Sequence, residues 1–495
     1  MLLSDLFLFS LETLTFEFFL SLLILNLLLF GSYLSQQKIN YLYIKIVNNI
    51  ILYFLIFLFI FLFNTPDFSI TLLNGIFIFD NFSKLLKLIL VVNMFLVILI
   101  QRKYLINYNL LKFETSIFML IVLLGLAIIN SSYHFIILYL GLELQSLSFY
   151  ILASSNTKSI FSSEAAIKYF ILGAIASGFI LYGISIIYLI SGTLNFGNLS
   201  CILLNVNKIY NLKIFLSLFY GLLFFLIGLL FKLGAYPFHN WLPDVYEGSP
   251  SNVTALFSIV PKTIIFGLII RLFYTIFYDI FEFFEIIFYF CALFSILFGS
   301  FVSLYQKKIK RLLAYSSITH TGFILLGFLS NSFENIQSIL FYLIFYIIMT
   351  VNLWSILLSI FQKKKTLFYL SQLLNFHRLN GYITFIFILT LFSMAGIPPL
   401  AGFFSKMFIF FSALKDCNYG IVIIGFLLSV VSTFYYIRII KIMFFEKSYE
   451  VITIENFSKA NSIVLAINTQ ILLFFFINPN YLLNFLNKIV FSFLI

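Results

Sequence analysis

Long runs of apolar residues recur along almost the whole chain, and short polar stretches separate them. Each run is close to the ~20 residues that an α-helix needs to cross the hydrocarbon core of a bilayer. The pattern predicts about fourteen membrane-spanning helices, with ends defined to within several residues. The predicted spans are residues 6–34, 41–63, 79–100, 113–131, 133–153, 162–190, 213–246, 251–275, 281–304, 311–331, 336–361, 381–413, 420–445 and 460–478. A mixed tail follows from Pro479.

No polar stretch is long enough to form a separate soluble domain, so the sequence predicts one all-α integral membrane bundle. Three connections carry basic clusters, at 101–103, 306–311 and 362–365. Such clusters gather on the cytoplasmic or matrix side of a membrane. The last two flank adjacent helices and could lie on opposite sides, so the sequence leaves the orientation open.

Two of the predicted spans are too long for one straight helix. Residues 213–246 would extend about 51 Å at 1.5 Å per residue, well beyond a hydrocarbon core of ~30 Å. Pro237 interrupts this span, and the pair Pro398-Pro399 interrupts 381–413 in the same way. Helices broken at membrane depth, in corresponding halves of a chain, mark the transport site of repeat-built transporters.

The two long spans hold equivalent places in two halves of the chain. Lys232 and Lys406 each fall in the fourth helix of a five-helix unit, beside a proline break. Because each unit has an odd number of spans, the second unit is inverted relative to the first. The expected parts are an N-terminal three-helix segment (1–110), a first repeat (111–278, helices 4–8), a second repeat (279–446, helices 9–13) and a C-terminal helix with its tail (447–495).

Composition supports a membrane protein and argues against other classes. Apolar residues make up 62% of the chain and charged residues 9%. The net charge of +11 comes from scattered basic residues beside apolar runs, which favours membrane-flanking loops over a nucleic-acid-binding surface. Cys201, Cys291 and Cys417 lie far apart, so neither a metal site nor a disulfide is predicted. The abundance of residues with AT-rich codons, above all Phe and Tyr, indicates a mitochondrially encoded protein.

Four charged side chains fall inside otherwise apolar spans: Glu143, Lys232, Lys262 and Lys406. A charge at bilayer depth costs at least about 2.5–3.5 kcal/mol, and such residues mark paths for ions or protons. Burial disfavours a charged ammonium whereas a nearby carboxylate favours it, so a lysine in this position can exchange its proton. We expect Glu143 to pair with Lys232, Lys262 to act as relay and Lys406 as the terminal site.

The alternative for these charges is that they hold helices together by buried pairing, although a buried ion pair is weak evidence of stability. His320 could relay protons between Lys262 and Lys406, or be a hydrogen-bonded packing residue. His239, Asp244 and Glu247, after the first break, could form a channel mouth or a solvated helix end. Glu12, Glu17, Lys84 and Lys87 have helix-end or snorkelling explanations, or could face a neighbouring subunit. A local ion pair is a sufficient explanation for Glu164 and Lys168.

Five blocks of sequence resemble the family of subunit 2 of respiratory complex I, the proton-translocating NADH:ubiquinone oxidoreductase. They are FKLGAYPFHNWLPDVYEGSPSNVTALFSIVPK (231–262), GLELQSL (141–147), EAAIKYFILGAIASG (164–178), LLAYSSITHTGF (312–323) and SMAGIPPLAGFFSK (393–406). The resemblance covers residues 110–445 in the right order. The first three spans and the tail match in hydropathy only.

The resemblance implies a role for each buried charge. Glu143 and Lys232 would be the coupling pair, Lys262 the bridge, and Lys406 the site that exchanges protons with the intermembrane side. Lysine at 262 and at 406 favours subunit 2 over its two antiporter-like paralogues, as does a chain that ends near its last predicted span. Pro261 departs from the family pattern, and we expect it to kink the helix just before Lys262.

The resemblance also implies partners and a location. They are the other membrane-arm subunits of complex I, including its other antiporter-like subunits, and membrane lipids, in the mitochondrial inner membrane. NADH, FMN, iron–sulfur clusters and ubiquinone would be bound elsewhere in the complex. This chain has no phosphate loop and no haem or iron–sulfur spacing, so we expect no cofactor, no metal and no redox chemistry in it. The alternatives are a cation/proton antiporter subunit of the Mrp type and a proton-inert scaffold.

Overall fold

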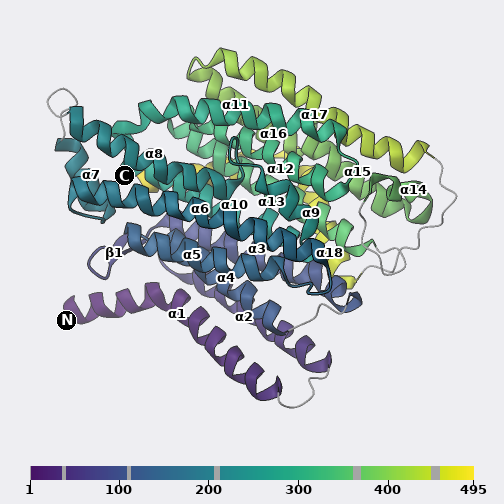
Figure 1. Cartoon of the computed structure of the whole chain (residues 1–495), viewed down its shortest axis with the longest axis horizontal. Coiled ribbons are helices and arrows are strands. Elements are labelled where there is room, and N and C mark those ends of the chain that lie inside the picture. Colours follow the sequence, from purple (N-terminus) through teal and green to yellow (C-terminus); the bar gives the residue numbers. More distant parts are fainter. Residues whose placement is uncertain are drawn as a thin grey trace.

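The computed structural model describes residues 2–35, 41–67, 69–108, 113–205, 212–360, 369–446 and 458–494. Its long helices lie side by side (Figure 1). Within this described part, twelve helices are long and apolar enough to cross a membrane, some with a short turn at one end. They are α1 (Leu2–Ser35), α2 (Tyr41–Asn64), α3 (Asn81–Asn107), α4 (Phe113–Ser131), α5 (Phe135–Ala153), α6 (Ile160–Ser191), α8 (Leu212–Leu233), α10 (Ser251–Arg271), α11 (Phe281–Tyr305), α13 (Phe333–Ser359), α17 (Tyr419–Phe445) and α18 (Lys459–Phe474).

Shorter elements connect or complete these helices. The short α-helices are α7 (Phe196–Asn205), α9 (Trp241–Gly248), α12 (Ile309–Leu325), α14 (Phe376–Leu379), α15 (Gly381–Ala395), α16 (Ala401–Lys415) and α19 (Asn480–Leu494). Single turns of π or 3-10 helix are η1 (Leu272–Ile276), η2 (Tyr278–Ile280), η3 (Leu326–Phe328), η4 (Leu370–Leu373) and η5 (Phe475–Ile477). Strands β1 (Ile70–Leu72) and β2 (Phe77–Phe79) form a small antiparallel hairpin.

The all-α membrane fold predicted from the sequence is confirmed. Each predicted span falls on helical structure, with 311–331 on the shorter α12 and its turn η3, and 381–413 on the pair α15 and α16. The hairpin and α7 were not predicted, because neither is long enough to register as an apolar run.

Most of the mixed tail that follows Pro479 forms helix α19, for which no secondary structure was predicted from the sequence. Leu486 and Val490 lie one turn apart on its buried face. Phe493 stacks on Phe82 of α3, with ring centroids 4.4 Å apart, and Phe491 on Phe333 of α13, at 4.3 Å. The helix is amphipathic and too short to span, so its apolar residues do not form the continuous run that reveals a membrane span.

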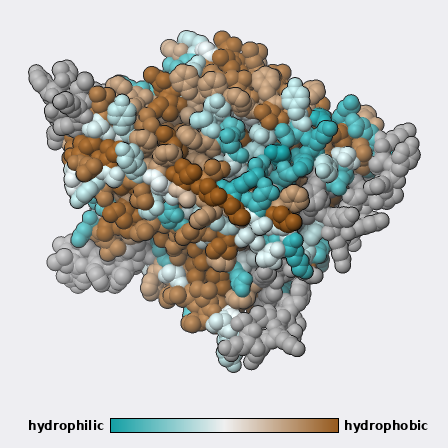
Figure 2. Space-filling view, viewed as in Figure 1, coloured by the Kyte–Doolittle hydropathy of each residue, from teal (hydrophilic) through white to brown (hydrophobic). Residues whose placement is uncertain are grey.

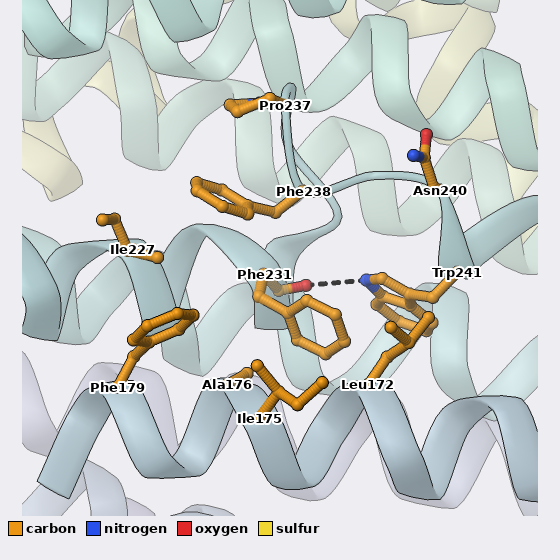
Figure 3. Close-up of a pocket in the computed structure, with 10 residues that line it drawn as sticks. All are labelled: Leu172, Ile175, Ala176, Phe179, Ile227, Phe231, Pro237, Phe238, Asn240 and Trp241. Carbon is orange, nitrogen blue, oxygen red and sulfur yellow. Dashed lines mark hydrogen bonds between the residues drawn. The ribbon is translucent and has the colours of Figure 1, made fainter.

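Both long spans are broken helices, as predicted. In the first, α8 ends at Leu233, the chain turns through Gly234 at φ +70°, and α9 begins at Trp241. The indole Nε1 of Trp241 donates to the carbonyl oxygen of Phe231 at 2.9 Å (Figure 3). This bond satisfies a carbonyl that the interrupted helix leaves without an intrahelical partner.

The second break has the same local pattern. Helix α15 ends at Ala395, Gly396 takes φ +86°, and α16 begins at Ala401. In both breaks a glycine in the left-handed region is followed three residues later by proline, at Pro237 and at Pro399. The two lysines do not occupy matching positions, however, since Lys232 lies before its break and Lys406 lies after its own.

Helix ends that carry basic residues meet on one side of the bundle. A small cavity is lined by Tyr104 at the end of α3, Ser251 at the start of α10, Lys310 at the start of α12 and Ile360 just after α13. Nearby, the amide nitrogen of Leu370 donates to the carbonyl oxygen of Lys307 at 2.9 Å. We call this side the basic face, defined by Arg102, Lys103, Lys307, Lys308, Lys310 and Arg311.

The orientation left open by the sequence can be read from this arrangement. The clusters at 101–103 and 306–311 lie on the same face, and the cluster at 362–365 falls outside the described residues. Figure 2 shows hydrophilic side chains gathered over α9 and α12, beside brown, apolar surface. The positive-inside rule predicts that the basic face lies toward the cytoplasm or matrix.

The opposite face carries the other ends of the same helices. There, Arg271 at the end of α10 forms an ion pair with Asp80, which caps the start of α3; the guanidinium Nη2 lies 2.8 Å from the nearer carboxylate oxygen. Asn335 near the start of α13 donates through Nδ2 to the Asp416 carboxylate beyond α16, at 3.0 Å. These contacts place the starts of α3 and α13 and the ends of α10 and α16 on the face opposite the basic one.

Candidate functional site

Four of the five candidate residues are buried in the bundle, and they come from four different helices. Lys232 lies in the last turn of α8, Lys262 in α10, His320 in α12 and Lys406 in α16. Glu143, in α5, is partly buried. The structure therefore places charged side chains of separate helices inside the protein, at the cost that makes such residues uncommon in membranes.

One face of α12 connects Lys262 with Lys406. Ser317, His320 and Phe323 follow one another at intervals of three residues, so they lie on the same side of the helix. Lys262 contacts Ser317 at one end of this face, and Lys406 lies over the ring of Phe323 at the other, with Nζ 5.0 Å from the ring centroid. His320 occupies the position between them.

The ammonium of Lys262 has three neighbouring groups that can stabilise its charge. Its Nζ donates to the Ser317 carbonyl oxygen and to the Tyr346 hydroxyl, each at 3.2 Å. It also lies 5.2 Å from the centroid of the Tyr346 ring. Helix α10 continues through Pro261 without interruption, so the kink expected there does not break the helix.

Lys406 is held by the second helix break. Its Nζ donates to the carbonyl oxygen of Ala395, the last residue of α15, at 2.8 Å. The side chain runs over Gly396, where an added Cβ would lie 2.9 Å from Lys406 Cδ. The broken helix thus supplies a free carbonyl for the ammonium and leaves space for its stem, which is how irregular backbone serves ion sites in transporters.

Both ring nitrogens of His320 are occupied by tyrosine hydroxyls. Nδ1 lies 2.7 Å from the hydroxyl of Tyr342 in α13, and Nε2 lies 3.1 Å from that of Tyr436 in α17. Lys262 and Lys406 are both close enough to interact electrostatically with the ring. A histidine bonded on both sides can accept a proton on one nitrogen and release it from the other.

A small cavity lies between His320 and the groups that bind Lys262. It is lined by His320, Ser317 and Tyr346 among others, and has a volume of about 20 Å³. That volume is enough for one water molecule, which needs roughly 10–15 Å³ and two to four polar partners. A single water there would join the contacts of Lys262 to the histidine.

Glu143 and Lys232 are near each other but do not form a direct ion pair. They interact electrostatically, yet their charged atoms lie beyond 4.0 Å and make no hydrogen bond with one another. Within the described chain, Glu143 Oε1 is buried without a hydrogen-bond partner, and Oε2 accepts a bond from Ser146 Oγ at 3.3 Å. The predicted direct contact is absent, and a bridging water remains the prediction for this pair.

An apolar pocket of about 190 Å³ lies beside Lys232, at the first break. Figure 3 shows Ala176 and Phe179 of α6 on one side of it, with Phe238 of the break and Trp241 of α9 on the other. The charged group that interacts electrostatically with Lys232 is Glu143 of α5.

Lys310 was not singled out from the sequence, where it reads as part of a basic loop. The structure places it in the first turn of α12, buried, with Nζ donating to the Ser249 carbonyl oxygen at 2.7 Å. It lies seven residues before Ser317 and hence on the same face of α12. The seven-residue spacing between Lys310 and Ser317 is the sequence signal that could have identified Lys310 as a residue of this face.

Other charged residues form pairs that stabilise the bundle. Lys87 was expected to have a helix-end or snorkelling explanation or to face a neighbouring subunit, but it is buried and its Nζ lies 2.7 Å from Glu17 Oε1. Glu164 and Lys168 form the expected local pair. Asp244 joins Lys168 of α6 to Arg311 of α12, so the charges after the first break form an ion network on the basic face.

Nothing in the described residues is arranged to hold a metal ion. No group of three or more His, Cys, Asp or Glu side chains converges in that part of the chain. Cys201 and Cys417 are exposed and Cys291 is buried, each as a free thiol.

The protein has many membrane-spanning helices, two broken helices and three lysines buried on separate helices. These features are typical of transporter-like membrane proteins. Residues 132–432 match the sequence profile of the family described as NADH:quinone oxidoreductase/Mrp antiporter, TM.

Individual relatives agree with this match. The chain is 38% identical to NADH-ubiquinone oxidoreductase chain 2 of Marchantia polymorpha, over 94% of this chain and 95% of that one. It is 37% identical to NADH-quinone oxidoreductase subunit N of Pelagibacter ubique, over 96% and 98%. A chain in the structure of respiratory complex I from Thermus thermophilus with bound aureothin is similar with a TM-score of 0.78 and 26% identity, over 95% and 98%. The chain therefore belongs to the NADH:quinone oxidoreductase/Mrp antiporter family.

Proposed function

We propose that this chain is a proton-translocating membrane-arm subunit of a respiratory NADH:ubiquinone oxidoreductase. The observation that carries the proposal is the face of α12 on which His320 stands between the binding sites of Lys262 and Lys406. Relatives named for subunit N or chain 2 of this oxidoreductase share almost the full length of the chain.

In this proposal each buried residue holds or passes a proton. Glu143 and Lys232 respond to charge arriving from a neighbouring subunit. Lys262 relays the proton through His320, and Lys406 exchanges it with the outer side. A lysine suits these positions because its ammonium can lose a proton when burial destabilises the charge, whereas a guanidinium stays protonated.

The chain would act as one part of a larger enzyme. NADH, FMN, the iron–sulfur clusters and ubiquinone would belong to other subunits, and this chain would carry out no electron transfer. Its partners would be the other membrane-arm subunits, including further antiporter-like ones. The plant relative and the AT-rich composition favour the mitochondrial inner membrane.

The internal organisation proposed from the sequence fits this role. The repeats 111–278 and 279–446 would be two inverted units, each contributing one broken helix to the proton path. The segments 1–110 and 447–495 would flank them.

The assembly that contains the chain tests the proposal and separates it from its alternatives. We expect the chain to migrate on a native gel in a very large complex with flavin and iron–sulfur subunits, and that complex to catalyse inhibitor-sensitive quinone reduction by NADH. Migration in a smaller assembly without redox subunits, with sodium/proton exchange, would identify an Mrp-type antiporter instead. A complex whose Lys262 and Lys406 can be replaced without loss of pumping would identify a scaffold.

A further inference from the structure

Helix α9, the second half of the first broken helix, contributes a side chain to the small cavity beside His320. Tyr246 of α9 is buried and lines this cavity of about 20 Å³ together with His320, Ser317 and Tyr346. Its hydroxyl group lies near the Ser317 side chain. We call this space the relay cavity, because Ser317 and Tyr346 also bind the Lys262 ammonium. The position of α9 therefore affects the space between the lysine and the histidine.

Charged residues on both sides of Tyr246 hold α9 against the start of α12, which lies beside it (Figure 1). Arg311 Nη2 donates to Asp244 Oδ1 at 2.9 Å. Glu247 forms an ion pair with Lys308, and its Oε2 lies 3.3 Å from Arg311 Nε. We call these four charged residues the α9/α12 clasp: Asp244, Glu247, Lys308 and Arg311.

The cations of the clasp stand where their own helix disfavours them. Lys308 is the N-cap residue of α12 and Arg311 lies in its first turn, which contains no acidic residue. The N-terminal end of a helix carries a partial positive charge, so cations are destabilising there. The carboxylates of α9 offset this effect only while α9 stays close. Buried Lys310 adds a third contact, since its Nζ donates to the Ser249 carbonyl oxygen just beyond α9 at 2.7 Å.

The other end of α9 is tied to the residue next to Lys232. Trp241, the first residue of α9, donates to the carbonyl oxygen of Phe231 at 2.9 Å (Figure 3). At the last residue of α9, a Cβ added to Gly248 would lie 2.5 Å from the Phe161 carbonyl oxygen of α6, so this end is closely packed too. A short helix held at both ends moves as one body, and a displacement at the end of α8 changes the relay cavity.

The clasp is better suited to fixing a position than to stabilising the fold. Its four side chains are partly exposed, and ion pairs between such groups contribute little to stability. They do, however, bracket the one residue of α9 that lines the relay cavity. A shift of α9 by a fraction of a hydrogen-bond length would remove the Tyr246 hydroxyl from reach of its neighbours.

We propose that Asp244 and Glu247 are positioning residues whose clasp with α12 sets the place of Tyr246 in the relay cavity. Through α9, a change of charge at Lys232 then alters the path of the proton in the second half of the chain. This inference rests on the proposed function, since it gives that function a link between its two halves.

A double-mutant cycle on proton flux tests the link. Tyr246→Phe keeps the ring and removes the hydroxyl, and Glu247→Gln removes a charge of the clasp at nearly constant volume. We expect each to lower proton flux per NADH oxidised at least about twofold in the assembled complex, because proton transfer needs groups within hydrogen-bond reach. The double variant should be no worse than Tyr246→Phe alone, since Glu247 acts through Tyr246.

A matched control and a charge exchange separate positioning from general electrostatics. Glu164→Gln removes an ion pair with Lys168 on α6 and should leave the flux unchanged. Lys308→Glu should lower the flux by placing two carboxylates together. Adding Glu247→Lys to Lys308→Glu restores an ion pair of reversed polarity and should recover most of the flux.

Three results would overturn the inference. They are normal flux in an assembled Tyr246→Phe complex, losses that add in the double variant, and poor assembly of Glu247→Gln with normal flux per electron in the assembled fraction. Any of these together with lost flux in Lys406→Ala would refute the clasp and keep the proposed function. Normal flux in Lys406→Ala would refute the function, whatever the clasp variants show.

Discussion

At the scale of single residues, the buried polar groups differ in whether they have hydrogen-bond partners within the protein. Lys262, His320 and Lys406 each have hydrogen-bond partners, so their positions are fixed. Lys232 makes no hydrogen bond or ion pair within the described chain, and one oxygen of Glu143 has none either. A charge without a fixed partner responds most strongly to a change of charge nearby, which suits the first pair of a coupled path.

Glu143→Gln tests the coupling role of this pair. Glutamine has nearly the same volume, so assembly of the complex should be close to normal. Loss of the negative charge should leave Lys232 without its electrostatic partner and strongly reduce proton flux per NADH oxidised. Native-gel amounts and flux measured on the same membranes check this, and poor assembly with normal flux in the assembled fraction would indicate a structural role.

His320→Gln separates a relay from a packing histidine. Glutamine can still bond to the tyrosine hydroxyls but does not accept and release a proton near neutral pH. We expect proton flux to fall about tenfold or more, as for loss of a positioned proton carrier, with assembly retained. Unchanged flux in a stable His320→Gln complex would show that the residue only fills space between α13 and α17.

The sequence was sufficient to predict which residues belong to the candidate site, but it predicted few of the contacts that they make. A charged residue inside an apolar run can be recognised directly in the sequence, which is why Lys232, Lys262 and Lys406 could be predicted. Which face of a helix meets the core depends on tertiary packing, so Lys310 read as a loop residue and Lys87 as a snorkelling one. The separation between Glu143 and Lys232, which is longer than an ion-pair distance, cannot be obtained from spacing along the sequence either.

At the scale of elements, the two broken helices could be predicted because excess length and proline are both properties of the sequence. Helix α19 could not, since polar residues interrupt its short apolar runs and it is too short to span. The shared location of the connections at 101–103 and 306–311 also required the structure, because it depends on Tyr104 and Lys310 lining the same cavity.

Gly402→Ala tests the packing of the second break. A Cβ at this position would lie 1.8 Å from the Ser393 carbonyl oxygen, so α15 and α16 would have to separate. We expect a loss of about 1–3 kcal/mol or more in stability, as for overpacking of a core. The matched control is Gly178→Ala in α6, where an added Cβ meets nothing within 4 Å. Thermal dissociation of the complex should shift for the first variant only, and equal shifts would contradict the close approach.

At the scale of the whole molecule, the distribution of charge predicts the orientation in the membrane. Arg102, Lys103 and the cluster at 306–311 should face the matrix or cytoplasm, with Asp80, Glu334 and Asp416 on the outer side. The exposed native thiols belong to Cys201 in the middle of α7 and to Cys417 just beyond the end of α16. Both should react with an impermeant reagent added from the outer side, and reaction only from the inner side would reverse the orientation.

The central claim is that Lys406 exchanges protons at the end of the buried path, and replacement of this one residue tests it most directly. Proton flux and NADH oxidation are measured together in membranes with Lys406→Ala and with Lys406→Arg. We predict that both variants assemble, lose most of their proton flux and oxidise NADH more slowly, because the arginine keeps the charge but cannot release its proton. Normal flux per electron and normal turnover in a fully assembled Lys406→Ala complex would contradict the account.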